Sequence, residues 1–360
     1  MKKYNYLLLL LSFLMLRIFP ANCQELNYTQ NFNSLLNLNP AYTGLTQGLK
    51  ARFLFRDQWP KLPIDFKSYY FSADIGDRSL PGAGGIGLVV QSDNPGFGLI
   101  NTLSLGLTVS VRQRIGSFSA IQVGIKAAML QKKINWNDLT FSDQLDKRFG
   151  SVYQTDFIDP NSGKRIAPDF GAGGIIHFAA SEDVVSGNIG LGVDHLFQPD
   201  VSFYSNENSK VFRKWTAHGD VRFTLDQGNK KPMKLEIGGI YQKQDDFSSM
   251  QLGLNGVVQN FYLGAWYKST LSGISPNTVI ALTGGFKYEF AEDMSIKFMY
   301  SYDIQVSGAL MGTGGAHEIS LILDLSSISL FGNGGGGRGR GYHLPNRGYS
   351  NISPLECSEF

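Results

Sequence analysis

A six-residue stretch, Gly82-Ala83-Gly84-Gly85-Ile86-Gly87, has the glycine spacing of a phosphate-binding loop. In that fingerprint the glycines follow a strand and open a helix, whose N-terminus binds the phosphate. Here Leu88-Val89-Val90-Gln91 follows, and its β-branched and apolar residues indicate a strand. We therefore interpret the glycines as residues of a turn and of a crowded strand, and we expect no nucleotide cofactor.

The histidines could serve a metal site or a hydrolase. His177, His195, His218 and His317 fall on or near strand-like runs, and none has metal-ligand spacing or belongs to a G-x-S-x-G or H-E-x-x-H arrangement. His218 and Asp220 share one face of a run, so a triad completed by a serine from another strand stays a remote alternative. The favoured interpretation is scattered polar residues, with no catalytic residue and no metal.

The stretch from Lys132 to Asp169 carries several acidic side chains that could bind calcium. Their spacing does not match an EF-hand loop, and basic residues alternate with them. We favour a solvated external loop that folds over a mouth or meets a partner. The charged residues concerned are Asp143, Asp146, Asp156, Asp159, Asp169, Lys147, Arg148, Lys164 and Arg165.

The elements that would position these residues are strands, because hydrophobic residues alternate with a period of two from Leu49 onward. In the run Leu99–Gln113, leucines and valines occupy one face, and Ser, Thr and Arg112 occupy the other. The runs Trp215–Leu225 and Met294–Ile304 repeat this pattern. A soluble sandwich also alternates, but its strands usually have about 5 to 6 residues. These runs have about 10 to 13, close to what a tilted membrane strand needs.

The sequence therefore predicts an all-β, transmembrane outer-membrane β-barrel of about 14 antiparallel strands, with the N- and C-terminal segments periplasmic or in the lumen. If the first strand runs outward, the two longest connections, Gln131–Asp169 and Gln198–Arg213, are extracellular. Charges of both signs inside the barrel should pair with one another rather than select ions. The predicted strands are Leu49–Asp57, Phe66–Gly76, Gly84–Ser92, Leu99–Arg114, Phe118–Gln131, Phe170–Ala180, Asn188–Phe197, Lys214–Gln227, Lys234–Lys243, Met250–Val258, Asn260–Lys268, Thr278–Phe290, Met294–Gln305 and His317–Ser327.

Composition and the N-terminus point to export. Only 17% of the 360 residues are charged, against about 25% in soluble domains, and the formal charge of +2 gives no general attraction to nucleic acid. Lys2 and Lys3 precede an apolar run, and Ala21-Asn22-Cys23 offers small residues before a cleavage site, which predicts a signal peptide over residues 1–23. Lipidation at Cys23 is a weaker alternative. After cleavage only Cys357 remains, which excludes an internal disulfide and a four-cysteine zinc site.

Residues 24–48 precede the barrel, residues 49–327 form it, and residues 328–360 form a Gly/Arg-rich tail. Within the first of these segments, Asn39-Pro40-Ala41-Tyr42-Thr43-Gly44 is a constrained corner, because proline fixes φ and glycine accepts backbone angles that other residues resist. This corner can turn the preceding segment under or into the barrel, where Leu35, Leu36 and Leu38 would find apolar cover.

The corner resembles the "NPAYAG" opening of the PorP/SprF family, outer-membrane proteins of the Bacteroidota type IX secretion and gliding apparatus. Arg56-Asp57-Gln58-Trp59-Pro60 resembles the "RNQWPG" element of the same family, with Asp57 and Lys61 as departures. The resemblance is best in the first third of the mature chain. It marks as candidate structural or partner-binding residues Asn39, Pro40, Ala41, Tyr42, Gly44, Arg56, Gln58 and Trp59.

The resemblance implies a non-enzymatic outer-membrane barrel that supports type IX secretion or the surface attachment of a secreted adhesin. The implied partners are cargo with a C-terminal sorting domain, periplasmic ring or peptidoglycan-associated components, and outer-membrane lipid, with no nucleic acid. An outer-membrane diffusion or uptake channel is the alternative, and a barrel hydrolase is a remote one.

Overall fold

The computed structural model describes residues 27–63, 66–76, 83–96, 100–116, 118–158, 163–180, 184–204, 208–225, 233–271, 277–291, 293–308 and 311–328. The predicted signal peptide and nearly all of the predicted tail lie outside these residues.

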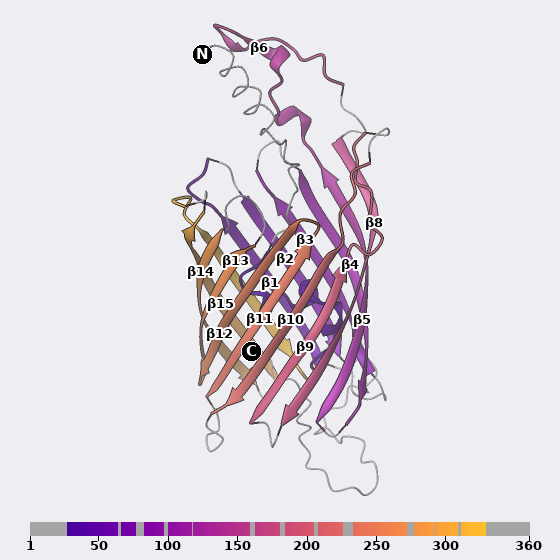
Figure 1. The fold of residues 1–360 in the computed structure, drawn as a ribbon, viewed down its shortest axis with the longest axis vertical. Coiled ribbons are helices and arrows are strands. Elements are labelled where there is room, and N and C mark those ends of the chain that lie inside the picture. The colour runs from indigo at the N-terminus through magenta and orange to yellow at the C-terminus, as the bar shows by residue number, and fades with distance from the viewer. Residues whose placement is uncertain are drawn as a thin grey trace, which may run out of the picture.

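A closed antiparallel barrel dominates the fold, as the sequence predicted (Figure 1). Each strand pairs with its neighbours along the chain, and the first strand closes the barrel against the last, from Leu49 opposite Leu325 to Gln58 opposite Ala316. The fourteen barrel strands are β1 (Gly48–Gln58), β2 (Phe66–Gly76), β3 (Ala83–Asn94), β4 (Asn101–Arg114), β5 (Ser119–Lys133), β8 (Lys164–Ala180), β9 (Val185–Asp194), β10 (Lys214–Thr224), β11 (Lys234–Gln244), β12 (Phe247–Val258), β13 (Phe261–Thr270), β14 (Thr278–Ala291), β15 (Met294–Ser307) and β16 (Ala316–Leu325).

Several strand ends differ from the prediction. β8 begins at Lys164 rather than Phe170, because β5 and β8 stay paired as far as Lys133 opposite Lys164. Pro168 is tolerated inside β8 because β9 pairs only from Ala172 onward, so no ladder bond to β9 is lost there. The connection between β5 and β8 also contains a small two-stranded sheet, β6 (Leu145–Asp146) and β7 (Gly150–Ser151). β9 ends at Asp194 rather than Phe197, because His195 adopts a left-handed φ of 54°.

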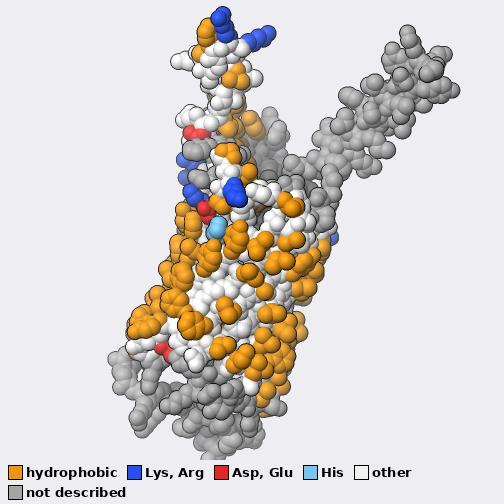
Figure 2. Space-filling model, turned by 90° about the vertical axis from the view of Figure 1, so that its left-hand side faces the viewer, with side chains coloured by type: hydrophobic (Ala, Val, Ile, Leu, Met, Phe, Trp, Pro, Cys, Tyr) orange, Lys and Arg blue, Asp and Glu red, His pale blue; other side chains and the backbone are white. Residues whose placement is uncertain are grey.

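Alternation places apolar side chains outside and polar side chains inside. On β4, Leu105, Leu107 and Val109 are exposed, whereas Thr108 and Arg112 are buried in the lumen. Figure 2 shows hydrophobic side chains spread over the visible side of the barrel wall. An apolar outer face of this extent suits contact with lipid. No helix among the described residues is long and apolar enough to cross a membrane.

Residues Asn27–Gln47, called the plug below, fill the lumen. The plug contains η1 (Asn31–Asn33), α2 (Leu35–Leu38) and η2 (Pro40–Tyr42), and most of its side chains are buried. Its path begins beside Ser249, near the start of β12, and ends at the start of β1, so it runs along the inside of the barrel. Of the two places that the sequence left open, the lumen is the one this segment occupies.

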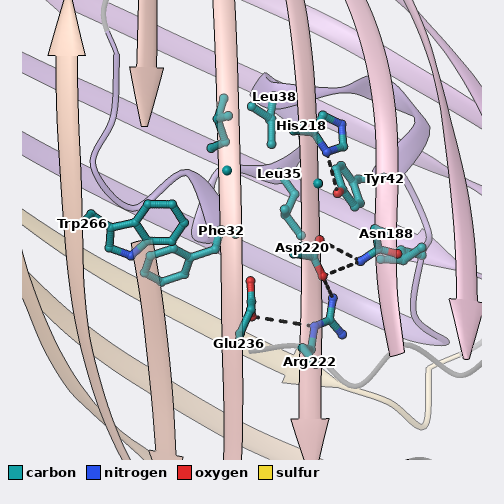
Figure 3. Close-up of a pocket in the computed structure, with 15 residues that line it drawn as sticks. Phe32, Leu35, Leu38, Tyr42, Asn188, His218, Asp220, Arg222, Glu236 and Trp266 are labelled. Atoms are coloured by element: carbon teal, nitrogen blue, oxygen red, sulfur yellow. Dashed lines mark hydrogen bonds and ion pairs between the residues drawn. The ribbon is translucent and has the colours of Figure 1, made fainter. Parts of the chain in front are cut away.

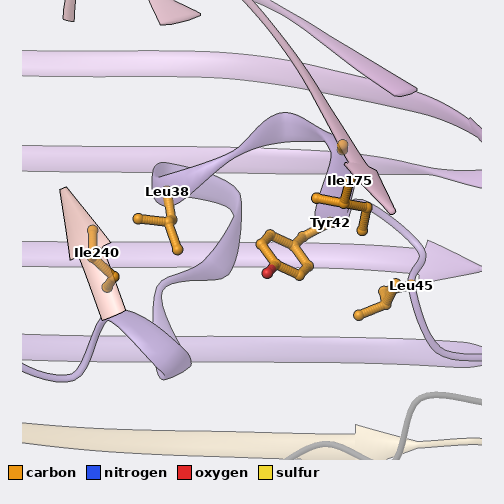
Figure 4. Close-up of a cluster of buried hydrophobic side chains, with 6 residues drawn as sticks. Leu38, Tyr42, Leu45, Ile175 and Ile240 are labelled. Carbon is orange, nitrogen blue, oxygen red and sulfur yellow. The ribbon is translucent and has the colours of Figure 1, made fainter. Parts of the chain in front are cut away.

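The apolar side chains of the plug are covered by inward-facing wall residues in two clusters. One joins Leu38, Ala41, Tyr42 and Leu45 to Ile175 of β8 and Ile240 of β11 (Figure 4). The other joins Tyr28 and Leu36 to wall residues of β1, β2 and β3, namely Leu54, Tyr70 and Val89. The leucines that were expected to need apolar cover therefore find it inside the barrel, with Leu36 and Leu38 buried and Leu35 partly buried.

Candidate functional site

The corner Asn39–Gly44 lies deep in the lumen, where side chains and backbone both hold it. Asn39 is extended and caps η2, since its Oδ1 accepts a hydrogen bond from the Ala41 N–H at 2.9 Å. Its Nδ2 donates to the carbonyl oxygens of Gly174 at 3.2 Å and Leu191 at 3.1 Å. Pro40 follows at the first position of η2, where a missing N–H costs nothing. One short helix start thus connects the plug to β8 and β9.

His218 of β10 completes this contact. Its Nε2 lies 3.1 Å from the Asn39 Nδ2, and its Nδ1 lies 3.1 Å from the Tyr42 hydroxyl. The Tyr42 and His218 rings also lie 5.2 Å apart between centroids. Both ring nitrogens of His218 therefore contact the plug, and this histidine serves to position the corner.

The end of the corner is held by polar groups of the opposite wall. The Thr43 carbonyl accepts hydrogen bonds from the Ser110 hydroxyl at 2.6 Å and from the Gln122 Nε2 at 2.7 Å. The Gly44 N–H donates to the Asp74 carboxylate at 2.8 Å, and Asp74 also pairs with Arg52. Gly44 has a φ of 60°, which a larger residue would resist, so the glycine predicted for this corner is required by the backbone.

Glycines in the barrel wall give the plug its room. A Cβ at Gly124 of β5 would overlap the Pro40 carbonyl, and one at Gly173 of β8 would overlap the Asn39 side chain. A Cβ at Gly85 of β3 would overlap Gly44 itself. The plug backbone therefore approaches the wall more closely than any side-chain-bearing residue would allow.

Arg56 anchors the other end of the plug. Its Nη2 donates to the Asp303 carboxylate at 2.9 Å, and its Nη1 donates to Glu318 at 3.0 Å and to the Thr29 hydroxyl at 2.9 Å. All three charged side chains are nearly inaccessible to solvent. The planar guanidinium donates to two carboxylates and to the plug at once, which the single ammonium group of a lysine could not do with the same geometry.

The plug backbone contributes to the same cluster. The N–H groups of Thr29 and Gln30 donate to the two oxygens of Glu318, at 3.0 and 2.7 Å. Lys268 of β13 adds a second cation, at 3.2 Å from Asp303. We call Arg56, Lys268, Asp303 and Glu318 the anchor cluster. Two cations balance two carboxylates there, so charge is neutralised within the lumen, as the mixed lining predicted.

Gln58 and Trp59 lie at the end of β1 rather than on the plug. Gln58 accepts a hydrogen bond from the Arg56 Nε at 3.2 Å, so it helps to orient the guanidinium. Trp59 has a left-handed φ of 59°, and its backbone N–H donates to the Gly315 carbonyl at 2.7 Å. Its ring packs edge-on against that of Phe66, with the ring centroids 4.8 Å apart. Trp59 thus shapes the connection between β1 and β2 and does not touch the corner.

A cavity remains between the plug and the wall residues of β9, β10, β11 and β13 (Figure 3). Phe32 and Leu35 of the plug form its apolar side, together with Trp266, whose ring stacks on that of Phe32 at 5.9 Å. Its polar side carries Asp220, 3.0 Å from Arg222. The described lining contains no Ser, Thr or Cys, and the hydroxyl of Tyr42 in this lining lies 3.1 Å from the His218 Nδ1.

The two motifs that hold the plug agree with a comparison to known families. A sequence model described as "Type IX secretion system membrane protein PorP/SprF" matches residues 21–323. The chain belongs to this family. Together with the barrel fold, membership places the protein in the bacterial outer membrane. A comparison with curated proteins found no match.

Three solved structures illustrate the similarity of this PorP/SprF barrel to known folds. They are the CymD monoaromatic hydrocarbon channel (10% identity, TM-score 0.43, covering 82% of this chain and 91% of that one), a Pseudomonas aeruginosa FadL homologue (12%, 0.43, 81% and 92%) and the Ralstonia pickettii toluene transporter TbuX (11%, 0.45, 81% and 92%). Identities and TM-scores this low carry no inference about ligand or function.

The structure of this PorP/SprF member brings together five of the predicted residues, Asn39 to Tyr42 and Gly44, and places Arg56 at the far end of the same plug. The sequence did not reveal their partners. Alternation along their strands places Asp303 and Glu318 in the lumen, but nothing in the sequence pairs them with Arg56. Gly124 and Gly173 occupy inward positions of their strands, and this placement could have identified them as points where another segment contacts the wall closely.

The remaining motifs have structural partners. His177 contacts Asn188 at 2.7 Å, and His317 contacts the Tyr300 hydroxyl at 2.7 Å. Gly84 to Gly87 lie within β3, and a strand follows them, so the helix that a phosphate loop needs is missing from this described stretch. The described residues contain no group of three or more His, Cys, Asp or Glu placed to hold a metal ion.

In the loop between β5 and β8, the acidic side chains fold the loop. The Asp143 carboxylate accepts hydrogen bonds from the Asp156 N–H and the Thr155 hydroxyl, both at 2.8 Å. These bonds, the one from Asp156 foremost, lower the pKa of Asp143 below its usual value. Asp146 accepts from the Arg148 and Phe149 N–H groups in the same way.

Proposed function

We propose that this barrel is a non-enzymatic scaffold of the type IX secretion system, which supports the export or surface attachment of cargo rather than the free diffusion of solutes. Family membership supports the secretion role. The observation that separates a scaffold from an open channel is the plug, whose two ends are fixed to the wall by the anchor cluster and by the corner.

The contacts of the plug favour a permanently filled lumen. A few exposed ion pairs would hold a sealing segment only weakly, since such pairs contribute about 0–1 kcal/mol each. Here the contacts are buried, and they include charge-assisted bonds to Glu318 and Asp303, the Asn39 amide on two wall carbonyls, and two apolar clusters. Breaking them all to open a pore would cost many kcal/mol.

The secretion role is tested by deleting the gene and following cargo that bears a C-terminal sorting domain. The expected result is cargo retained inside the cell and missing from the surface, with restoration by the wild-type gene. Normal surface display of every such cargo in the deletion strain would refute the proposal. Purification of the barrel from detergent-solubilised membranes, with identification of attached proteins by mass, would then show whether cargo or periplasmic ring components bind it.

The channel alternative is tested separately in planar bilayers. The intact protein should give no steady conductance, whereas a variant lacking residues 27–38 should conduct, because the anchor cluster then holds no plug. Steady open conductance from the intact, correctly folded protein would favour the diffusion-channel alternative over a plugged scaffold.

A further inference from the structure

Two lysines face each other on the outer surface of the barrel. Lys133 of β5 and Lys164 of β8 are directly opposite in the strand pairing, and both are exposed. Side chains at such positions have Cβ atoms about 4.5–5.5 Å apart, so two like charges there repel each other. Neither lysine has an ion pair with any described residue.

Alternation shows that both lysines point outward. On β5 the exposed apolar residues Ile125 and Met129 have odd numbers, as Lys133 does. On β8 the exposed residues Ile166 and Ile176 have even numbers, as Lys164 does. The pair therefore stands on the face of the wall that contacts lipid.

The height of the pair can be worked out from β8. Its large outward apolar residues run from Ile166 to Phe178, about twelve positions, which at about 3.3 Å per residue and a tilt of about 40° cover about 30 Å. That distance is enough to cross the apolar band of an outer-membrane barrel, which is about 25 Å tall. Lys164 is the next outward residue, about 5 Å beyond the band, where lipid headgroups lie.

The end of the barrel identifies the leaflet. The pair lies at the mouth from which the long connection 134–163 extends, and the connection 195–213 leaves the same mouth. The connections at the opposite end, such as Gln259 and Asn260 between β12 and β13, are short. Longer connections are extracellular in barrels of this kind, so the lysines stand at the outer leaflet.

A second pair reinforces the positive charge. Lys132 is opposite Arg165, one position from the first pair in each strand, so four cations occupy two consecutive rungs of the β5–β8 ladder. The alternation that turns Lys133 and Lys164 outward turns Lys132 and Arg165 toward the mouth. There the pKa of the Asp200 carboxyl is lowered, chiefly by the hydrogen bond from the Ser202 N–H and further by the charge of Arg165. The outward pair has no such acid among its contacts with the described residues.

We propose that Lys133 and Lys164 bind the phosphate of a phosphorylated glycolipid in the outer leaflet. Two ammonium groups that extend from opposed positions can contact one phosphate from both sides, which relieves their mutual repulsion. The acyl chains would then lie along Met129, Ile166 and the apolar wall beneath them. The ligand class is a lipid with an anionic headgroup, not a soluble anion.

The test uses the full-length protein in detergent and measures, by native mass spectrometry, the affinity for bis-phosphorylated lipid A and for the same lipid after dephosphorylation. The wild-type protein should prefer the phosphorylated form. Each change of Lys133→Gln or Lys164→Gln should weaken its binding about fivefold, and both together about thirtyfold. Lys243→Gln is the matched control, because Lys243 is an exposed, outward-facing lysine at the same mouth, and it should leave binding unchanged.

Three outcomes would overturn the proposal. The double variant could bind the phosphorylated lipid as tightly as the wild type does. The wild type could bind both lipids equally, which would show that the acyl chains alone determine the affinity. Inorganic phosphate at millimolar concentration could displace the lipid completely, which would identify a small-anion site. Heat-dependent migration in gel electrophoresis verifies that each variant forms the barrel.

Discussion

Replacing Arg56 should release the N-terminal end of the plug while the barrel stays folded. Arg56→Met keeps the length of the side chain but leaves Glu318 with only two backbone donors, from Thr29 and Gln30, and leaves Asp303 with Lys268 and the Thr29 hydroxyl. Removing one partner of a buried ion pair typically costs about 3–5 kcal/mol. Because these charges bind the plug directly to the wall, beside neutral hydrogen bonds such as Gln30–Ser301, we expect the cost to fall on plug attachment.

Amide exchange measures this loss directly. The Thr29 and Gln30 N–H groups donate to Glu318, so their protection reports attachment. A loss of about 3–5 kcal/mol corresponds to exchange that is about one hundred to several thousand times faster. Arg56→Lys should give a smaller effect, because it keeps the charge but loses the planar fork that reaches both carboxylates.

The control is Lys287→Met. Lys287 pairs with Glu289 at 3.5 Å, but both side chains are substantially exposed, 34% and 45%, so removing this pair should cost less than about 1 kcal/mol. The reasoning is refuted if Arg56→Met leaves the barrel folded and the protection of Thr29 and Gln30 at its wild-type level.

Three further changes test the rest of the lumen. Gly124→Val should push Pro40 off the wall and give the barrel a measurable conductance. The control is Gly256→Val, where a Cβ meets nothing closer than 3.9 Å, and this variant should show no conductance. Conductance in both variants or in neither would contradict this account. Pro40→Ala combined with Gly44→Val should loosen the plug, seen as new protease sites within residues 27–47, with the barrel still formed. Asp143→Asn should open the external loop to pepsin at pH 4. Because the pKa of Asp143 lies below the usual 3.8, the carboxylate stays charged and keeps its hydrogen bonds to the loop at that pH, and it loses them only as the pH falls further. Equal cleavage of variant and wild type at pH 4 would argue against this role.

The sequence predicted the barrel well because the restraint involved is local. A strand exposed to lipid on one face and to a polar lumen on the other must alternate along its length, and the length itself reflects the thickness of the membrane. The errors occur where that rule is incomplete. Pro168 normally marks the end of a strand, but β8 has no partner on one side at that point, so the strand continues.

The site was predicted less completely, because its contacts join distant parts of the chain. The corner was visible as Pro40 and Gly44, whose backbone preferences are local. Its partners on β8, β9 and β10 depend on how the strands are arranged around the lumen, and no pattern near residue 39 specifies them. The same holds for Arg56, whose carboxylate partners come from β15 and β16, far along the sequence.

The way in which the plug is attached determines how it could leave. Gln47 continues directly into β1, so that end cannot leave without disrupting the first strand, whereas Asn27 at the other end lies beside Ser249. The two ends of the plug are held by separate sets of contacts, the anchor cluster and the corner. Arg56→Met should accordingly speed exchange at Thr29 and leave the Ala41 N–H protected by Asn39, while Gly124→Val should release Ala41 and leave Thr29 protected. Loss of protection at both ends in either variant would mean that the plug detaches as one cooperative unit rather than one end at a time.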